Sequence, residues 1–193
     1  VLEPLKAACA LYDITTPARQ AAFLAQAGHE SGGFRYTSEI WGPSDAQRRY
    51  EGRRDLGNTQ PGDGERFKGH GFLQTTGRAN HAAVRDRLRA RLSIDVPDFE
   101  QEPEKLTELQ WACLSAADYW DMRRINELAD AGDFLGITRR VNGGTNGLAD
   151  RHARWERVKA VLEPAAPPSE PAHTPDPLAA FTAADTITPQ PQE

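Results

Sequence analysis

Hydrophobic and polar positions repeat with a helical period over most of the first 162 residues. In "PARQAAFLAQAGHE" (residues 17–30), apolar side chains recur three and four positions apart, the spacing that lines one face of a helix. Thr16 is a suitable N-cap, and Pro17 suits the first helical position. Gly32 and Gly33 suit the end of a helix. The pattern therefore predicts a helix that begins at Pro17 and ends before this glycine pair.

The same period returns in five later segments: "RANHAAVRDRLRARL", "PEKLTELQWACLSAADYWDM", "INELADAG", "DFLGITRRV" and "LADRHARWERVKAVL". The second of them is long and apolar enough to be the central buried helix. Between Trp41 and Gly77 the chain is instead rich in glycine, with short apolar stubs. A long loop region in a compact domain commonly carries function. The expected fold class is mainly α: a helical bundle with a loop-rich lobe, room for a small β-hairpin, and a cleft between the lobes.

The composition changes at residue 163. Eight of the 14 prolines lie beyond this point, mixed with alanine, threonine and acids. Such a segment cannot bury enough apolar surface to offset the entropy of ordering it. We expect two parts: a folded domain in residues 1–162 and a disordered Pro/Ala-rich acidic tail or linker in residues 163–193.

The formal net charge of −5 comes from this C-terminal segment. Five of the 28 acids and none of the 23 bases lie from Glu163 onward, so residues 1–162 carry 23 of each sign. A neutral domain disfavours a nucleic-acid partner held by phosphate contacts. No run approaches the roughly 18 apolar residues of a membrane span, and the first residues lack the pattern of a signal peptide. We expect neither nucleic-acid binding nor membrane insertion.

Cysteine and metal patterns are sparse. Cys9 and Cys113 lie in apolar helical settings, which favours buried free thiols and leaves a disulfide as the alternative. His29-Glu30 lacks the second histidine of a zinc-binding H-E-x-x-H motif, because position 33 is glycine. No calcium loop, Walker or dinucleotide pattern is present. We expect no metal and no cofactor.

Two acids flank a glycine-containing loop in "QAGHESGGFRYTSE" (residues 26–39). Glu30 follows Phe23 by seven positions, which places it at the edge of the buried helix face. Burial and the negative helix end both favour the protonated carboxylic acid, the form that a general acid needs. Glu39 would supply the second carboxyl group of a glycosidase. On position alone, an exposed helix-end acid and a solvated loop acid remain the stronger interpretations.

Three blocks in order strengthen the glycosidase interpretation: "GHESGGF", "YEGRRDLGNTQPGDGERFKGHGFLQTTGRANH" and "VNGGTNGLADR". Together they resemble the signature blocks of glycoside hydrolase family 19, and most closely its phage-endolysin and bacterial branch. The resemblance spans most of residues 17–160. It implies a lysozyme-like α+β fold and a glycoside hydrolase activity.

The resemblance also implies roles for individual residues. Glu30 matches the general acid, Glu39 the base that activates water in an inverting mechanism, and Thr76 a hydroxyl that holds this water. For His29, a packing role remains the alternative to a place at the site. His70, His81 and Thr75 depart from the family pattern, which has arginine, tyrosine and an aliphatic residue there. The expected substrate-binding residues are His29, Gln74, Asn80, Asn142, Arg151, Tyr50 and Arg53.

The expected function is that of an endolysin-type muramidase, a monomer that hydrolyses β-1,4 bonds in peptidoglycan glycan strands. A chitinase of the same family, acting on chitin oligomers, is the alternative enzyme. A non-catalytic sugar-binding or structural phage protein would be expected to have lost one acid. A lytic transglycosylase needs only one acid, so Glu39 and Thr76 favour attack by water. We expect synthesis in the cytoplasm without a recognisable signal peptide, and action on the cell wall or periplasm after release or delivery.

Overall fold

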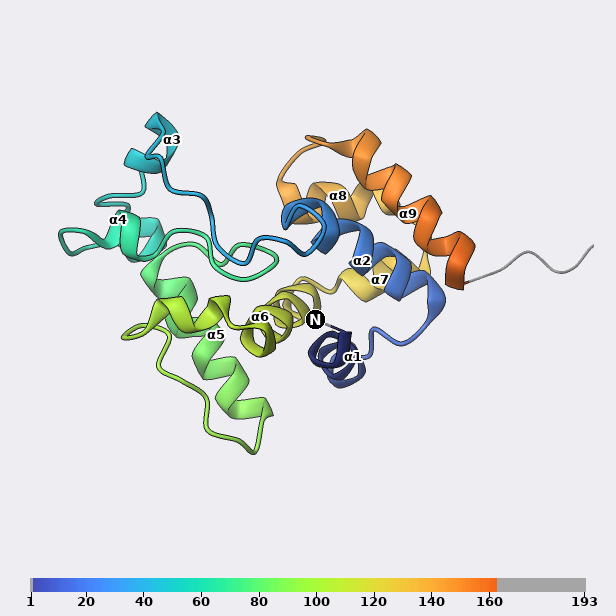
Figure 1. Ribbon diagram of the computed structural model, residues 1–193, viewed down its shortest axis with the longest axis horizontal. Helices are drawn as coiled ribbons and strands as arrows, with labels where there is room; N and C mark the ends of the chain where they lie inside the picture. The colour runs from blue at the N-terminus through green and yellow to red at the C-terminus, as the bar shows by residue number, and fades with distance from the viewer. Residues whose placement is uncertain (1, 163–193) are drawn as a thin grey trace, which may run out of the picture. The chain divides into compact units, whose positions relative to one another are not determined.

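The computed structural model describes residues 2–162 of the chain (Figure 1). The tail predicted for residues 163–193 lies outside the described residues. The described part is built almost entirely of helices, which confirms the expected mainly α class. In chain order the elements are α1 (Leu2–Leu11), α2 (Pro17–Glu30), α3 (Asp45–Arg48), η1 (Arg54–Leu56), α4 (Asp63–Arg66), α5 (Arg78–Arg91), η2 (Pro103–Thr107), α6 (Leu109–Met122), α7 (Ile125–Asp130), α8 (Phe134–Asn142) and α9 (Leu148–Leu162).

Helix α6 is the centre of the core. Nine of its 14 residues are buried, and α1, α5 and α7 pack around it (Figure 1). This confirms the central buried helix, but the helix begins later than expected. Residues Pro103–Thr107 form the separate 3-10 turn η2, and Glu108 is extended between the two. An extended residue cannot continue a helix, so the segment divides there.

Helix α2 starts and ends as its sequence predicts. Thr16 caps it by accepting a hydrogen bond from the Arg19 backbone at 3.3 Å, Pro17 is its first residue, and Glu30 is its last. Its buried face packs against α9. Phe23 also meets Trp120 of α6 edge to face, with ring centroids 5.2 Å apart. The helix that carries the predicted general acid is therefore held on two sides.

Both cysteines are buried and free, as expected. Cys9 lies on α1 and Cys113 on α6. Burial raises the pKa of each thiol to about 11. Both side chains therefore stay neutral near pH 7 and act as small apolar groups of the core.

A loop-rich lobe, residues 37–77, holds the short elements α3, η1 and α4. In Figure 1 these elements lie on the same side of α6 as α5, away from α8 and α9. In place of the small hairpin that the sequence allowed, two isolated antiparallel bridges form, Ser38 with His70 and His70 with Thr75. The lobe therefore depends on side-chain contacts more than on a sheet.

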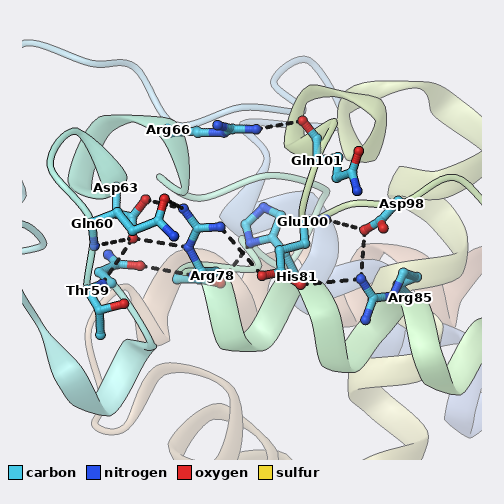
Figure 2. A network of polar contacts seen from close by, with 12 residues as sticks. Thr59, Gln60, Asp63, Arg66, Arg78, His81, Arg85, Asp98, Glu100 and Gln101 are labelled. Atoms are coloured by element: carbon cyan, nitrogen blue, oxygen red, sulfur yellow. Dashed lines mark hydrogen bonds and ion pairs between the residues drawn. The ribbon is translucent and has the colours of Figure 1, made fainter.

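Arg78, the first residue of α5, anchors this lobe (Figure 2). Its Nη2 donates to Oδ1 of the buried Asp63 at 2.5 Å. The other carboxylate oxygen of Asp63 accepts the backbone N–H groups of Thr59 and Gln60, each at 3.0 Å. The guanidinium holds the pKa of Asp63 below its usual value. Because breaking one half of such a buried pair costs about 3–5 kcal/mol, the loop from 59 to 66 is firmly attached to α5.

Two buried histidines, His70 and His81, hold the turn between residues 70 and 77. Nδ1 of His81 donates to the Gly77 carbonyl at 2.9 Å, so its Nε2 is free to accept a hydrogen bond from Nδ1 of His70 at 3.0 Å. Burial lowers the pKa of His70 to about 3 and that of His81 to about 4. His70 and His81, which both depart from the family pattern, thus form a hydrogen-bonded pair of neutral rings.

We expect this pair to make stability depend on pH. The unfolded histidines take up protons below about pH 6.5 while the folded ones stay neutral, so the free energy of unfolding falls as the pH drops from 6.5 toward 4. The slope is up to about 1.4 kcal/mol per pH unit for each histidine. Chemical denaturation at pH 7 and pH 5 measures it.

A double variant His70→Gln/His81→Gln provides the comparison. It should be less stable at pH 7 because the paired rings are lost, yet its stability should change less between pH 7 and pH 5. If the free energy of unfolding changed equally with pH in the wild-type protein and in the double variant, the pH dependence could not be assigned to the His70–His81 pair.

Candidate active site

The three predicted catalytic residues line one cavity of about 390 Å3, here called the acid cavity. Glu30 reaches it from the end of α2, while Glu39 and Thr76 reach it from the loop-rich lobe. Residues 46 positions apart along the chain are thus brought to one hollow between the lobes. The lining residues are Glu30, Tyr36, Ser38, Glu39, Ile40, Tyr50, Gln74 and Thr76.

Glu30 is held by a buried arginine. Its Oε1 accepts a hydrogen bond from Nη2 of Arg151 on α9 at 2.5 Å. The Glu30 side chain is 23% exposed, whereas that of Arg151 is 1% exposed. The carboxyl group therefore faces the cavity, and the guanidinium holds it from the protein side.

Arg151 is itself fully hydrogen-bonded. Nη1 donates to Oε1 of Gln26 at 2.6 Å, and Nε donates to the Asn146 carbonyl at 3.1 Å. Gln26 in turn donates through Nε2 to Thr138 of α8 at 2.9 Å. This chain of contacts, from Glu30 through Arg151 and Gln26 to Thr138, joins α2, α8 and α9. It fixes the orientation of the helix-end acid.

The same contact decides which oxygen of Glu30 is able to act. Oε1 is occupied by Arg151, and no hydrogen bond within residues 2–162 engages Oε2. A neutral carboxylic acid still accepts through its carbonyl oxygen. When Glu30 carries its proton, Oε2 is therefore the oxygen that presents it to the cavity.

Glu39 is held by the loop-rich lobe. Its backbone N–H donates to the Gly69 carbonyl at 2.8 Å, and the Gly69 N–H donates to Oε2 of Glu39 at 3.0 Å. Oε1 accepts from Nε2 of Gln47 at 2.9 Å and from the Tyr50 hydroxyl at 3.5 Å. Burial, followed by the negative charge of Glu39, raises the pKa of Tyr50. Tyr50 therefore stays a hydrogen-bond donor at neutral pH.

Gln47 organises the segment that carries Glu39. It lies in α3, where it and Ser44 form a capping box. Its Oε1 accepts the Ser44 N–H at 2.7 Å, while its Nε2 also donates to the Ile40 carbonyl at 2.8 Å. One buried amide thus joins the helix cap, the loop backbone and the carboxylate.

Gly69 leaves room for the Gln74 side chain, which would have to move if residue 69 carried a Cβ atom. A Cβ atom there would lie 2.3 Å from Oε1 of Gln74, far inside contact distance. Gln74 itself has a positive φ of 52°, an uncommon backbone state for a residue with a side chain. The turn between 69 and 76 is therefore tightly packed where it presents Gln74 and Thr76 to the cavity.

Two further cavities adjoin the first. A middle cavity of about 120 Å3 shares Gln74 and Thr76 with the acid cavity, and Asn80 lines it. A third cavity of about 510 Å3, here called the arginine cavity, shares Tyr119 and Arg123 with the middle one. Its lining residues are Tyr119, Arg123, Gly136, Arg139, Arg140, Val141, Asn142 and Gly143. The predicted sugar-binding amides are thus spread along three adjoining cavities.

Asn142, the last residue of α8, differs from the other amides in its environment. Its Oδ1 is the one buried side-chain oxygen or nitrogen within residues 2–162 that has no hydrogen-bond partner. Buried acceptors are nearly always satisfied in folded proteins. Such an acceptor beside a cavity can take a hydrogen bond from a water molecule or from a ligand.

His29 and Arg53 lie away from the lining of the acid cavity. Nδ1 of His29 donates to Asp150 of α9 at 2.7 Å, which favours the packing role. Hydrogen bonds from Arg154 and then from His29 hold the pKa of Asp150 at about 2. Arg53 forms an ion pair with Asp55. Neither residue contacts Glu30 or Glu39 through a side-chain hydrogen bond within the described chain.

Within residues 2–162 no group of three or more histidine, cysteine or acidic side chains is arranged to hold a metal ion. No helix of this part of the chain is both long and apolar enough to cross a membrane.

Comparison with known proteins identifies relatives of this fold and site. No family model matches the chain. A curated relative from Haemophilus influenzae, described as a glycosyl hydrolase family 19 domain-containing protein, is 34% identical over 161 residues. The match covers 69% of this chain and 74% of the relative.

Solved structures agree on the fold. Chitinase C from Streptomyces griseus superposes with a TM-score of 0.65 at 19% identity, covering 84% of this chain and 69% of that one. A bacterial family 19 chitinase gives a TM-score of 0.64 at 22% identity, covering 84% and 86%.

A two-acid cavity on this fold, together with these relatives, defines the protein as a glycoside hydrolase. The identity and coverage of the Haemophilus match show the family: the chain belongs to glycoside hydrolase family 19.

Several residues of the site were not predicted from the sequence. Gln47 carried a local signal, because serine three residues before glutamine is a capping-box pattern, but nothing local indicated its contact with Glu39. Gln26 lies on α2 one turn before Glu30 and could have been found from this spacing. Tyr36 and Ile40, which are 41% and 73% exposed at the acid cavity, gave no signal.

We expect Gln47→Leu to lower kcat about tenfold with a smaller effect on KM. Leucine has a similar volume but cannot donate to Glu39, so the carboxylate loses a charge-assisted hydrogen bond and its fixed position. Steady-state kinetics on glycan substrate measure the effect.

Gln101→Leu, at an exposed position, is the matched control and should leave kcat unchanged. An unchanged kcat in Gln47→Leu, at equal melting temperature, would contradict a positioning role for Gln47.

Proposed function

We propose that the protein hydrolyses β-1,4-glycosidic bonds of peptidoglycan glycan strands by an inverting acid/base mechanism. The observation that carries the chemistry is the single cavity lined by Glu30, Glu39 and Thr76. Two carboxyl groups from different parts of the fold, with a hydroxyl lining the same cavity, suit protonation of the leaving oxygen and activation of water. The cavity of about 390 Å3 has room for a sugar ring and an attacking water.

Glu30 acts as the general acid through Oε2. As its proton passes to the glycosidic oxygen, negative charge develops on the carboxylate. The guanidinium of Arg151, 2.5 Å from Oε1, stabilises this charge in a buried setting where the interaction is strong. Arg151 is therefore a positioning and charge-stabilising residue rather than a direct sugar contact.

Glu39 acts as the base. Its carboxylate is already desolvated on one side and held by Gln47, Gly69 and Tyr50, so its orientation needs little change in the reaction. The Thr76 hydroxyl donates to the Gln74 carbonyl at 3.2 Å, which leaves its oxygen to accept a hydrogen bond from the water and so to orient it. Tyr36 and Ile40 expose apolar surface at the cavity, against which the apolar face of a sugar ring can pack.

The polymer we propose is peptidoglycan, because the cavities beyond Thr76 are lined by arginines and peptidoglycan carries carboxylates. Chitin, the alternative, is favoured by the chitinase names of the structural relatives, but it is a neutral polymer. Rates on purified peptidoglycan and on chitin oligomers, compared at equal concentrations of sugar, separate the two.

We expect Glu30→Gln to lower kcat on glycan substrate by about 10²–10⁴. Glutamine preserves the shape and still accepts from Arg151, but it has no acidic proton to give. Release of reducing sugar ends is the measurement. Glu104→Gln, an exposed acid on η2, is the control and should retain full activity. A Glu30→Gln variant with near-normal turnover would overturn the assignment of the acid.

The stereochemistry of the product tests the base. If Glu39 acts through water, the new reducing end has inverted anomeric configuration, which NMR detects before mutarotation. Glu39→Gln should abolish most turnover, whereas Thr76→Val should reduce it less, since the hydroxyl only orients what the carboxylate activates. A retained configuration or a 1,6-anhydro product would instead require a mechanism without water attack by Glu39.

A further inference from the structure

The acid cavity continues toward a cluster of positive charge. Gln74 and Thr76 connect it to the middle cavity, and Tyr119 and Arg123 connect the middle cavity to the arginine cavity. The arginine cavity is thus linked to the acid cavity through residues that each of them shares with the middle cavity.

Within residues 2–162, the three arginines of this cavity, Arg123, Arg139 and Arg140, have no carboxylate partner. Most arginines elsewhere in residues 2–162 that lie at element ends pair with acids, as Arg19 and Arg78 do. By contrast, no carboxylate within that range lies at salt-bridge distance from Arg123, Arg139 or Arg140, and no acid lines the cavity.

Part of this cluster has a structural explanation. Arg140 donates through Nη1 to the Arg123 carbonyl at 2.8 Å, which caps the end of α6. The guanidinium of Arg123 lies 4.7 Å from the centroid of the Tyr119 ring, and Tyr119 donates to the Arg140 and Val141 carbonyls. These contacts orient the cluster but leave the charges unpaired. For Arg139 the described chain provides no side-chain hydrogen bond at all.

We propose that the arginine cavity binds a carboxylate carried by the glycan substrate outside its sugar backbone. Three exposed guanidinium groups with no acid beside them within residues 2–162 attract an anion, and guanidinium groups match carboxylates in geometry and charge. This assignment rests on the proposed peptidoglycan activity. Two groups of that polymer carry the required carboxylate, the peptide stem and, where the stem has been removed, the lactyl group of the muramic acid.

Asn142 supports a ligand of this kind independently of charge. It lines the same cavity, and its Oδ1 lacks a donor among the described residues. A stem peptide or an N-acetyl group provides an N–H beside the carboxylate or sugar. The cavity thus combines donors for an anion with an acceptor for an amide, a combination suited to an acylated amino acid or amino sugar.

The test uses the double variant Arg123→Gln/Arg139→Gln, in which Arg140 is retained because it caps α6. The matched control is Arg157→Gln, an exposed arginine of α9 outside all three cavities. Three polymers are compared: glycan strands with stem peptides, strands stripped of stems by an amidase, and neutral chitin oligomers. We expect the ratio of kcat/KM on charged to neutral polymer to fall about tenfold in the double variant and to stay constant in the control.

The two charged polymers distinguish the source of the carboxylate. A loss confined to strands with stems assigns the stem peptide, a loss confined to stripped strands assigns the free lactyl carboxylate, and an equal loss on both shows that the cavity accepts either carboxylate. Unchanged ratios on both would overturn the assignment.

A binding measurement separates this inference from the proposed function. In the Glu30→Gln background, calorimetry compares a disaccharide with its stem, a disaccharide with a free lactyl group, and a neutral chitin disaccharide. At least one charged probe should bind about tenfold more weakly when Arg123 and Arg139 are replaced, whichever polymer is hydrolysed. Equal affinities in both proteins would refute the carboxylate site. A wild-type enzyme with no preference for peptidoglycan over chitin would refute the proposed substrate alone.

Discussion

The ion pair between Glu30 and the buried Arg151 is the constraint on which the site and much of the fold depend. A guanidinium that is 1% exposed must have its charge and its donors satisfied, and here every donor nitrogen has a partner. These partners come from α2 and from the loop before α9, and Gln26 extends the connection to α8. The Arg151 guanidinium and its partners therefore fix α2, α8 and α9 relative to one another. Glu30, the proposed general acid, is one of the partners, so the geometry of the proposed site and the packing of the domain depend on the same interaction.

The two acids are supported in different ways. Glu30 ends a helix whose buried face packs against α9 and α6. Glu39 lies in a lobe without regular strands, where a few amides and one tyrosine hydroxyl determine its position. A rigid acid opposite a more lightly supported base is a reasonable arrangement for a polymer cleft, because one wall can adjust to substrate while the other stays fixed.

Local sequence patterns predicted the helices well, because the period of apolar residues and the end signals of α2 are short-range features. The start of α6 was misplaced, since the helical pattern continues through Glu108 although its backbone is extended. The acid pair was predicted through the family resemblance, which spacing along the chain could not replace. The roles of Gln47 and of the cavity arginines could not be predicted from the sequence, because their contacts join segments that are far apart in the chain. In the sequence, Arg123 and Arg139 look like ordinary cations near helix ends. Only the structure shows that the ends of α6 and α8 line the same cavity.

The support of Glu39 by Gln47, Gly69 and Tyr50 also bears on how this enzyme can be altered. Gln47, Ser44 and the loop from 39 to 47 make few contacts with the hydrophobic core, and α1, α2 and α6 pack without them. Libraries at residues 40–43, 45 and 46, with Glu39, Ser44 and Gln47 retained, would thus explore substrate range while the melting temperature stays near that of the parent. The helical core therefore supplies stability, while these positions of the loop from 39 to 47 can vary in sequence. This division makes the protein a suitable starting point for laboratory evolution.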